Sequence, residues 1–214
     1  MNVHPISPSA VVRRIWDIYR QHAAVLVGTA LLLFALEFIV LLLLPGASIA
    51  ITILFWALNV LYQGMVVELV QDVEAGRSGL SIADLLRSVE PVLLPLMGVS
   101  ILYAIGVAIG FVFLIIPGLI LLVIWSVVAP VTVLERPGVF AAFGRSRELV
   151  RGNGWNVFGV ILIVGLAVIV VSLAAGLVAA SLGSAGGALI QWAVTAALAP
   201  VTALAASVLY FALR

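Results

Sequence analysis

Residues 155–182, WNVFGVILIVGLAVIVVSLAAGLVAASL, form one uninterrupted stretch without a charged side chain. A transmembrane helix needs about 20 consecutive apolar residues to cross the hydrocarbon core of a bilayer. This stretch exceeds that length and lacks the polar face that a surface helix of a soluble domain carries. It therefore predicts a membrane-spanning helix.

The composition of the whole chain agrees with this prediction. Of 214 residues, 65% are hydrophobic and 9% are charged, and the mean hydropathy is +1.35. A soluble domain has about 45–50% apolar and about 25% charged residues. We therefore expect an integral membrane protein in which nearly all of the length is used for spans, with no room for a large soluble catalytic domain.

Apolar runs of spanning length occur six times and predict an all-α, polytopic bundle of six transmembrane helices. The runs cover residues 23–44, 47–70, 92–116, 118–134, 155–182 and 188–213. The boundary between the third and fourth, at Pro117-Gly118, admits two interpretations. It is either a tight outer turn or a kink within a differently divided pair of helices.

The basic residues are all arginines, and their positions orient the chain. They precede the first span, lie between the second and third and between the fourth and fifth, and end the chain, whereas the other three connections carry no charge. The positive-inside rule predicts that both termini are cytoplasmic, in the plasma membrane of a bacterium. The net charge of +1 argues against nucleic-acid binding. The arginines expected to meet lipid headgroups are Arg13, Arg14, Arg20, Arg87, Arg145, Arg147 and Arg151.

Each arginine-bearing segment also predicts a short amphipathic helix in the inner interface. One has Val12, Ile15, Trp16 and Tyr19 on its apolar face, one follows a Ser81–Asp84 capping pair, and one covers 139–150. Arg14-x-x-Asp17 aligns with Arg145-x-x-Glu148 and Arg87-x-x-Glu90. We interpret the chain as a single membrane domain, 1–214, of three weakly repeated units, 7–70, 80–134 and 138–213. The alternative is that such residues flank membrane helices in general.

The stretches IPGLILLVIWSVVAPVTVLE, residues 116–135, and AAFGRSRELVRGNGWNVFG, residues 141–159, resemble the glycerophosphoryl diester phosphodiesterase membrane-domain family. The resemblance implies a bacterial multi-span protein. Some members of that family are fused to a soluble, metal-dependent phosphodiesterase domain. This chain has no room for that domain, so the resemblance implies no enzymatic activity and assigns no residue a role.

Five polar residues within the predicted spans are candidates for an intramembrane site: Glu37, Asn59, Gln63, Gln191 and Thr195. Glu37 is the carboxylate deepest in a span, and an ionisable group in hydrocarbon is by default a functional hypothesis. It is either a protonated side chain bonded to a neighbouring helix or part of a substrate or proton site.

Enzymatic chemistry has little support in the sequence. Cysteine is absent, and the two histidines, His4 and His22, are both N-terminal, so we expect no metal site, no cofactor and no enzyme. The first apolar run is long enough to span and follows a polar stretch, so we expect Met1 to Arg214 to be the mature chain, with no cleaved signal peptide.

Two functions remain. The sequence favours a non-enzymatic scaffold, assembly or accessory module whose partners are membrane lipids, another membrane protein or a second copy of the chain. The alternative is a transporter or carrier of a small amphiphilic or lipidic molecule. A solid apolar interior with a partner-facing groove would favour the scaffold, and a continuous polar cavity reaching Glu37 would favour the carrier.

Overall fold

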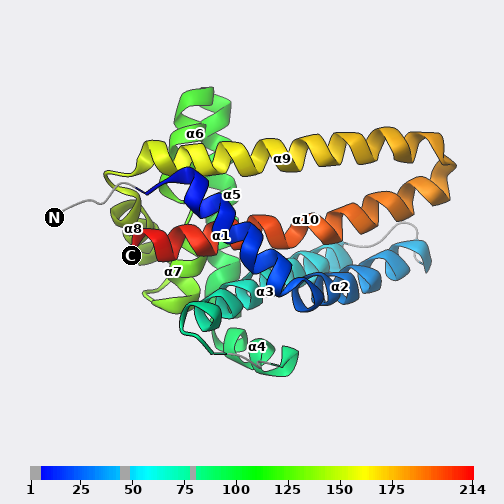
Figure 1. Ribbon diagram of the computed structural model, residues 1–214, viewed down its shortest axis with the longest axis horizontal. Helices are drawn as coiled ribbons and strands as arrows, with labels where there is room; N and C mark the ends of the chain where they lie inside the picture. Colours follow the sequence, from blue (N-terminus) through cyan, green and yellow to red (C-terminus); the bar gives the residue numbers. More distant parts are fainter. Residues whose placement is uncertain (1–5, 44–48, 78–80) are drawn as a thin grey trace.

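The computed structural model describes residues 6–43, 49–77 and 81–214, except for the side chains at positions 37–38, 41–43, 50 and 184–185. This part is helical and contains no strand (Figure 1). The helices are α1 (Pro8–Gln21), α2 (Ala23–Leu43), α3 (Ile49–Glu74), α4 (Ile82–Val89), α5 (Leu93–Phe113), α6 (Ile115–Ile124), α7 (Val128–Leu134), α8 (Val139–Val150), α9 (Gly154–Ser181) and α10 (Gly183–Leu213), with a 3-10 turn at Glu90–Val92 between α4 and α5.

Five helices are long and apolar enough to cross a membrane, or up to six if the bent pair of α1 and α2 counts as one span. The predicted all-α membrane architecture is thus confirmed. The order of elements also recurs, because a short helix (α1, α4 or α8) precedes each pair of long apolar arms. The arms are α2 with α3, α5 with α6 and α7, and α9 with α10.

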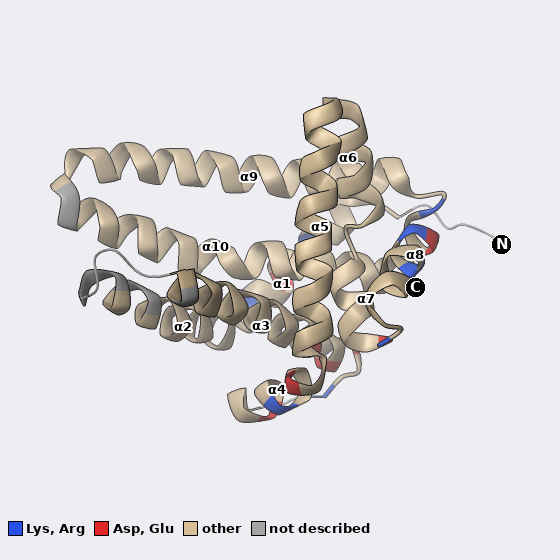
Figure 2. Ribbon diagram, turned by 180° about the vertical axis from the view of Figure 1, so that it is seen from behind, with Lys and Arg blue, Asp and Glu red and all other residues tan. Residues whose placement is uncertain are grey.

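The three hairpins point in different directions. Helices α5 and α6 stand upright in Figure 2, across the direction of α9 and α10. Helix α10 is the common centre, since it packs against α1, α2, α3, α7, α8 and α9. Because the hairpins diverge, their side chains do not fill all of the space between α3, α5, α9 and α10.

Charged residues gather where the hairpins converge, around α1, α4 and α8 and the adjoining ends of the long helices (Figure 2). We call this region the base. Two ion pairs join elements there, Arg14 with Glu74 at 2.8 Å and Arg145 with Glu135 at 2.8 Å. They connect α1 to α3 and α8 to the end of α7. The described residues at the tips of α5–α6 and α9–α10 carry no charge.

The boundary between the third and fourth predicted spans is a turn rather than a kink, and it lies slightly earlier than predicted. Helix α5 ends at Phe113, and Leu114 is extended, with φ −167° and ψ 151°. Pro117 is in the first turn of α6, where a missing N–H is tolerated. A Cβ on Gly110 would lie 2.9 Å from the Cα of Gly118, so glycines allow α5 and α6 to approach closely.

The fourth predicted span, 118–134, lies within a stretch, Ile115–Leu134, that is long and apolar enough to cross a membrane. A break divides this stretch into two helices. Helix α6 ends at Ile124 and α7 begins at Val128. Pro130 has no N–H to donate to the carbonyl of Ser126, four residues earlier, and its ring crowds that carbonyl. Ser146 of α8 donates its hydroxyl to the freed carbonyl of Ile124 at 2.9 Å, which stabilises the break.

The three short helices form as predicted, with one difference in α1. Its buried face consists of Val11, Ile15 and Ile18, and Trp16 is 58% exposed rather than on that face. Helix α4 has the complete capping box. The Ser81 hydroxyl accepts a hydrogen bond from the Asp84 N–H at 3.2 Å, and the Asp84 carboxylate accepts one from the Ser81 N–H at 3.2 Å.

Candidate functional site

A cavity of about 550 Å³ lies where the three hairpins diverge. Ligand sites in proteins typically measure about 300–1,000 Å³, so this space could accommodate a small molecule. Helices α3, α5, α9 and α10 and the break between α6 and α7 contribute its walls. The lining residues are Trp56, Asn59, Val60, Tyr62, Gln63, Val99, Ser100, Tyr103, Leu122, Trp125, Ser126, Val128, Ala129, Ile161, Val164, Gly165, Ala199, Thr202, Ala203, Ala205, Ala206 and Leu209.

Most of the lining is apolar, and its polar side chains are all uncharged. Asn59 donates its amide to the Phe55 carbonyl at 2.9 Å, within α3, and keeps its own oxygen free to accept. Gln63 lies one turn further along the same helix. Ser100 donates to the Leu96 carbonyl at 2.8 Å and keeps its acceptor capacity. The cavity therefore offers hydrogen-bonding groups within an apolar wall.

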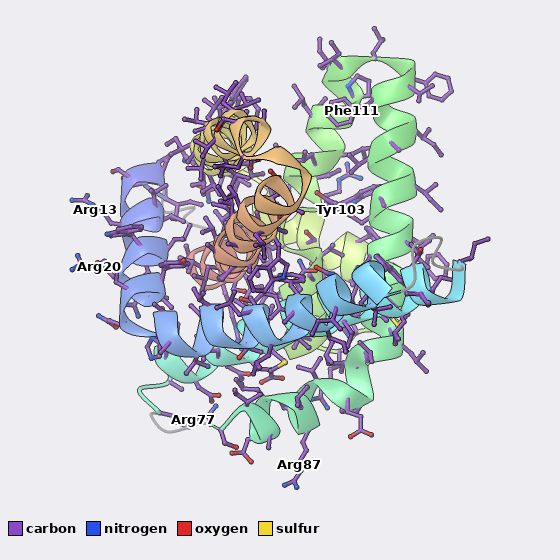
Figure 3. All side chains as sticks on the ribbon, turned by 90° about the vertical axis from the view of Figure 1, so that its right-hand side faces the viewer. Arg13, Arg20, Arg77, Arg87, Tyr103 and Phe111 are labelled. Carbon is purple, nitrogen blue, oxygen red and sulfur yellow. The ribbon has the colours of Figure 1, made fainter. Side chains whose placement is uncertain are left out.

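Two further polar side chains of the lining, Ser126 and Tyr103, offer hydroxyl groups for which the described residues show no hydrogen bond. The Ser126 Oγ is buried and has no hydrogen-bond partner. The Tyr103 hydroxyl makes no hydrogen bond to a described residue, and its side chain points from α5 toward the interior (Figure 3). A buried hydroxyl without a partner, as at Ser126, costs about 1–3 kcal/mol, so a bound group that satisfies it gains that amount.

Trp125 forms part of the wall and is held by close packing. A Cβ on Gly106 would come within 2.5 Å of its Cζ3, so only glycine lets α5 approach the indole. The Phe143 ring of α8 packs edge-on against it, with the ring centroids 4.9 Å apart. Gly106 and Gly110 therefore both allow close contacts between helices of the same chain.

The residues that line the cavity lie well inside their helices rather than at the helix ends. Tyr103 is ten residues into α5, and Gln63 is eleven residues from the end of α3 at Glu74. Val164, on the facing wall, is ten residues into α9. At 1.5 Å per residue, each lies about 15 Å along its own helix from the helix end that is nearer in sequence.

A hydrogen-bonded group joins three helices at the base. The hydroxyl of Tyr210, a fully buried residue of α10, donates to Glu135 Oε1 at 2.9 Å, and Arg145 Nε donates to the other carboxylate oxygen at 2.8 Å. The hydrogen bond to Glu135 raises the pKa of the Arg145 guanidinium, which stays charged. These contacts join α10 and α8 to the end of α7.

The structure brings together only part of the predicted intramembrane set. Asn59 and Gln63 line the cavity, but Gln191 and Thr195 lie exposed on α10, where the Thr195 hydroxyl donates to the Gln191 carbonyl at 2.8 Å. Glu37 belongs to α2, but its side chain lies outside the described residues. Four polar residues that were not predicted also line the cavity, although each interrupts an apolar run: Ser100, Tyr103, Ser126 and Thr202.

The predicted headgroup arginines divide into two groups. Arg14 and Arg145 are held by acidic partners, Arg145 also contacting Glu148 at 3.3 Å. The others are exposed and make no ion pair with any described residue: Arg13, Arg20, Arg87, Arg147 and Arg151. Trp155, which is 86% exposed, lies in the first turn of α9, shortly after α8 in the sequence. Exposed arginines without acidic partners and exposed aromatic rings are both typical of a membrane surface.

Among the described residues, no group of three or more histidine, aspartate or glutamate side chains is placed so that it could hold a metal ion. In comparisons with known proteins, no family model, no curated protein and no solved structure matches the chain. The candidate site therefore rests on the cavity and on the chemistry of the side chains around it.

Proposed function

We propose that this protein binds a small amphiphilic molecule inside the membrane and acts as its carrier, without catalysing a reaction on it. The observation that supports this most directly is the cavity of about 550 Å³, whose apolar wall carries uncharged polar side chains. An interior packed throughout with apolar side chains would instead have supported the scaffold that the composition favours.

The lining combines an apolar wall with a few polar groups, and this combination explains how such a molecule would be held. An acyl chain leaving lipid for an apolar wall gains little, since both surroundings are hydrocarbon. The headgroup gains more, because polar partners are scarce in the bilayer core and Gln63, Tyr103 and Ser126 supply them. Recognition would therefore come from the headgroup, while the apolar wall accommodates the chain.

We also propose that the base faces the cytoplasm of a bacterium, across its plasma membrane. The five arginines without an acidic partner would bind lipid phosphates there, as charge-assisted hydrogen bonds allow. The scaffold remains the second candidate. Exposed apolar side chains such as Phe140 and Leu94 would serve a protein partner, but lipid covers them equally well.

A variant that fills the cavity tests the carrier proposal. Gly165 lines the cavity, and a Cβ there meets nothing within 4 Å, so Gly165→Phe places a ring in the open space without a backbone clash. Gly176→Phe is the matched control. It lies eleven residues further along α9, on nearly the same helical face, where a Cβ also meets nothing within 4 Å, and it does not line the cavity.

Native mass spectrometry of gently purified protein provides the readout. We expect the original chain and Gly176→Phe to retain an amphiphile from the membrane, and Gly165→Phe to lose it while keeping its helical content by circular dichroism. Retention by Gly165→Phe at the level of the control would place the bound molecule elsewhere and refute a carrier site in this cavity.

A further inference from the structure

The hydrogen-bonding chemistry of the cavity lining narrows the class of ligand. Resting on the carrier function proposed above, we propose that the cavity selects single-chain amphiphiles whose headgroup is uncharged and both donates and accepts hydrogen bonds. A hydroxyl-bearing headgroup, such as the glycerol of a monoacylglycerol, has this chemistry.

The first reason to expect an uncharged headgroup is that the lining carries no charge. None of the lining residues is an aspartate, glutamate, lysine, arginine or histidine. A phosphate headgroup would therefore have no cation in the cavity, and an ammonium headgroup would have no carboxylate. A charge buried in hydrocarbon without a partner is costly, so the lining discriminates against both.

The second reason to expect a headgroup that donates and accepts hydrogen bonds is the set of polar groups in the lining. The Ser126 Oγ, buried without a partner, can donate one hydrogen bond and accept others. Gln63 offers amide donors and a carbonyl acceptor, and Tyr103 offers a hydroxyl. A phosphate can only accept from this set and an ammonium can only donate to it, whereas a hydroxyl headgroup pairs with both kinds of atom.

The size of the cavity limits the ligand to one chain. A volume of about 550 Å³ is in the middle of the range for sites that hold drug-sized molecules. It has room for a headgroup with the beginning of one acyl chain, not for two full chains. The remainder of a long chain would extend between the diverging hairpins into lipid.

Three probes that share one monounsaturated chain of the same length but carry different headgroups test the selection. Monooleoylglycerol is neutral, oleoyl lysophosphatidate is anionic and oleylamine is cationic. The full chain in nanodiscs is titrated with each, and the bound fraction is measured by native mass spectrometry. We expect monooleoylglycerol to bind at least tenfold more tightly than either charged probe, and Gly165→Phe to abolish its binding.

The outcomes separate the two proposals. Equal or tighter binding of a charged probe that Gly165→Phe abolishes would overturn the headgroup selection and leave the carrier proposal standing. Binding of none of the probes, together with no copurifying amphiphile, would overturn both. Binding that survives in Gly165→Phe would show association with the outer surface and would also overturn the selection.

Single polar substitutions locate the headgroup. We expect Ser126→Ala and Gln63→Leu each to weaken monooleoylglycerol binding about fivefold or more, without improving binding of the charged probes. Thr195→Val is the matched control, because it removes a hydroxyl of α10 that does not line the cavity and bonds only within its own helix. Unchanged affinity in both Ser126→Ala and Gln63→Leu would refute the assigned headgroup site.

Discussion

The contact between α3 and the α4–α5 segment depends on Gly64, and the cost of adding a methyl group there can be worked out. A Cβ on Gly64 would lie 2.5 Å from Val89 Cγ1 and 3.2 Å from Leu96 Cδ2. Carbon atoms prefer about 3.5–4.0 Å, so the nearer contact is about 1 Å too short. Val89 and Leu96 are fully buried, so neither has room to retreat.

Overpacking of this kind costs about 1–3 kcal/mol, whereas alanine gains up to about 1 kcal/mol over glycine in a helix. We therefore expect Gly64→Ala to lower the free energy of unfolding by about 1–2 kcal/mol. Val89→Ala alone should also destabilise, because it leaves a space in the core. In the double variant the new methyl occupies that space. The double variant should therefore lose about 1 kcal/mol less stability than the two single variants lose in total.

Unfolding by sodium dodecyl sulfate in mixed micelles, followed by circular dichroism, measures these differences. Gly98→Ala on α5 is the control, because the nearest atom to its Cβ would be Val139 Cγ2 at an ordinary 3.5 Å, and we expect it to be neutral or stabilising. Strict additivity of Gly64→Ala and Val89→Ala, or a Gly64→Ala variant as stable as Gly98→Ala, would refute the close approach.

Three smaller perturbations test the base. Tyr210→Phe removes a hydrogen bond to the Glu135 carboxylate and should lower the free energy of unfolding by about 1.5 kcal/mol in the same titration; no change would mean that the bond is not formed. Ser81→Ala removes the cap of α4 and should cost about 1 kcal/mol, measured as faster amide hydrogen exchange confined to that helix. Arg14→Ala breaks a partly exposed pair with Glu74 and should cost less than about 1 kcal/mol, an effect that high salt should abolish.

Much of the helical structure could be predicted because its causes are local. A span must satisfy its own backbone hydrogen bonds in lipid, so a long apolar run leaves the helix as the available structure. The Ser81–Asp84 cap and the proline at the start of α1 are also signals contained within a few residues. The lengths and order of the elements followed from these signals.

The break between α6 and α7 could not be placed in the same way. Pro130 indicates that the helix is interrupted nearby, but a proline can either kink a helix or begin a new one. Here the outcome is a break at 125–127, and the hydroxyl that bonds the carbonyl of Ile124 comes from Ser146, more than twenty residues later in the chain. The turn at Leu114 likewise depends on how closely α5 and α6 pack.

The sequence by itself therefore determined that the chain is helical, apolar and of spanning length, and that Asn59 and Gln63 are polar residues within one span. Only the tertiary structure decided that these two share a cavity with Ser126 and Tyr103, while Gln191 and Thr195 do not. The physical reason is that hydropathy depends on side-chain type and is additive along the chain. Membership of a cavity depends on how each helix is rotated and on which distant helices approach it.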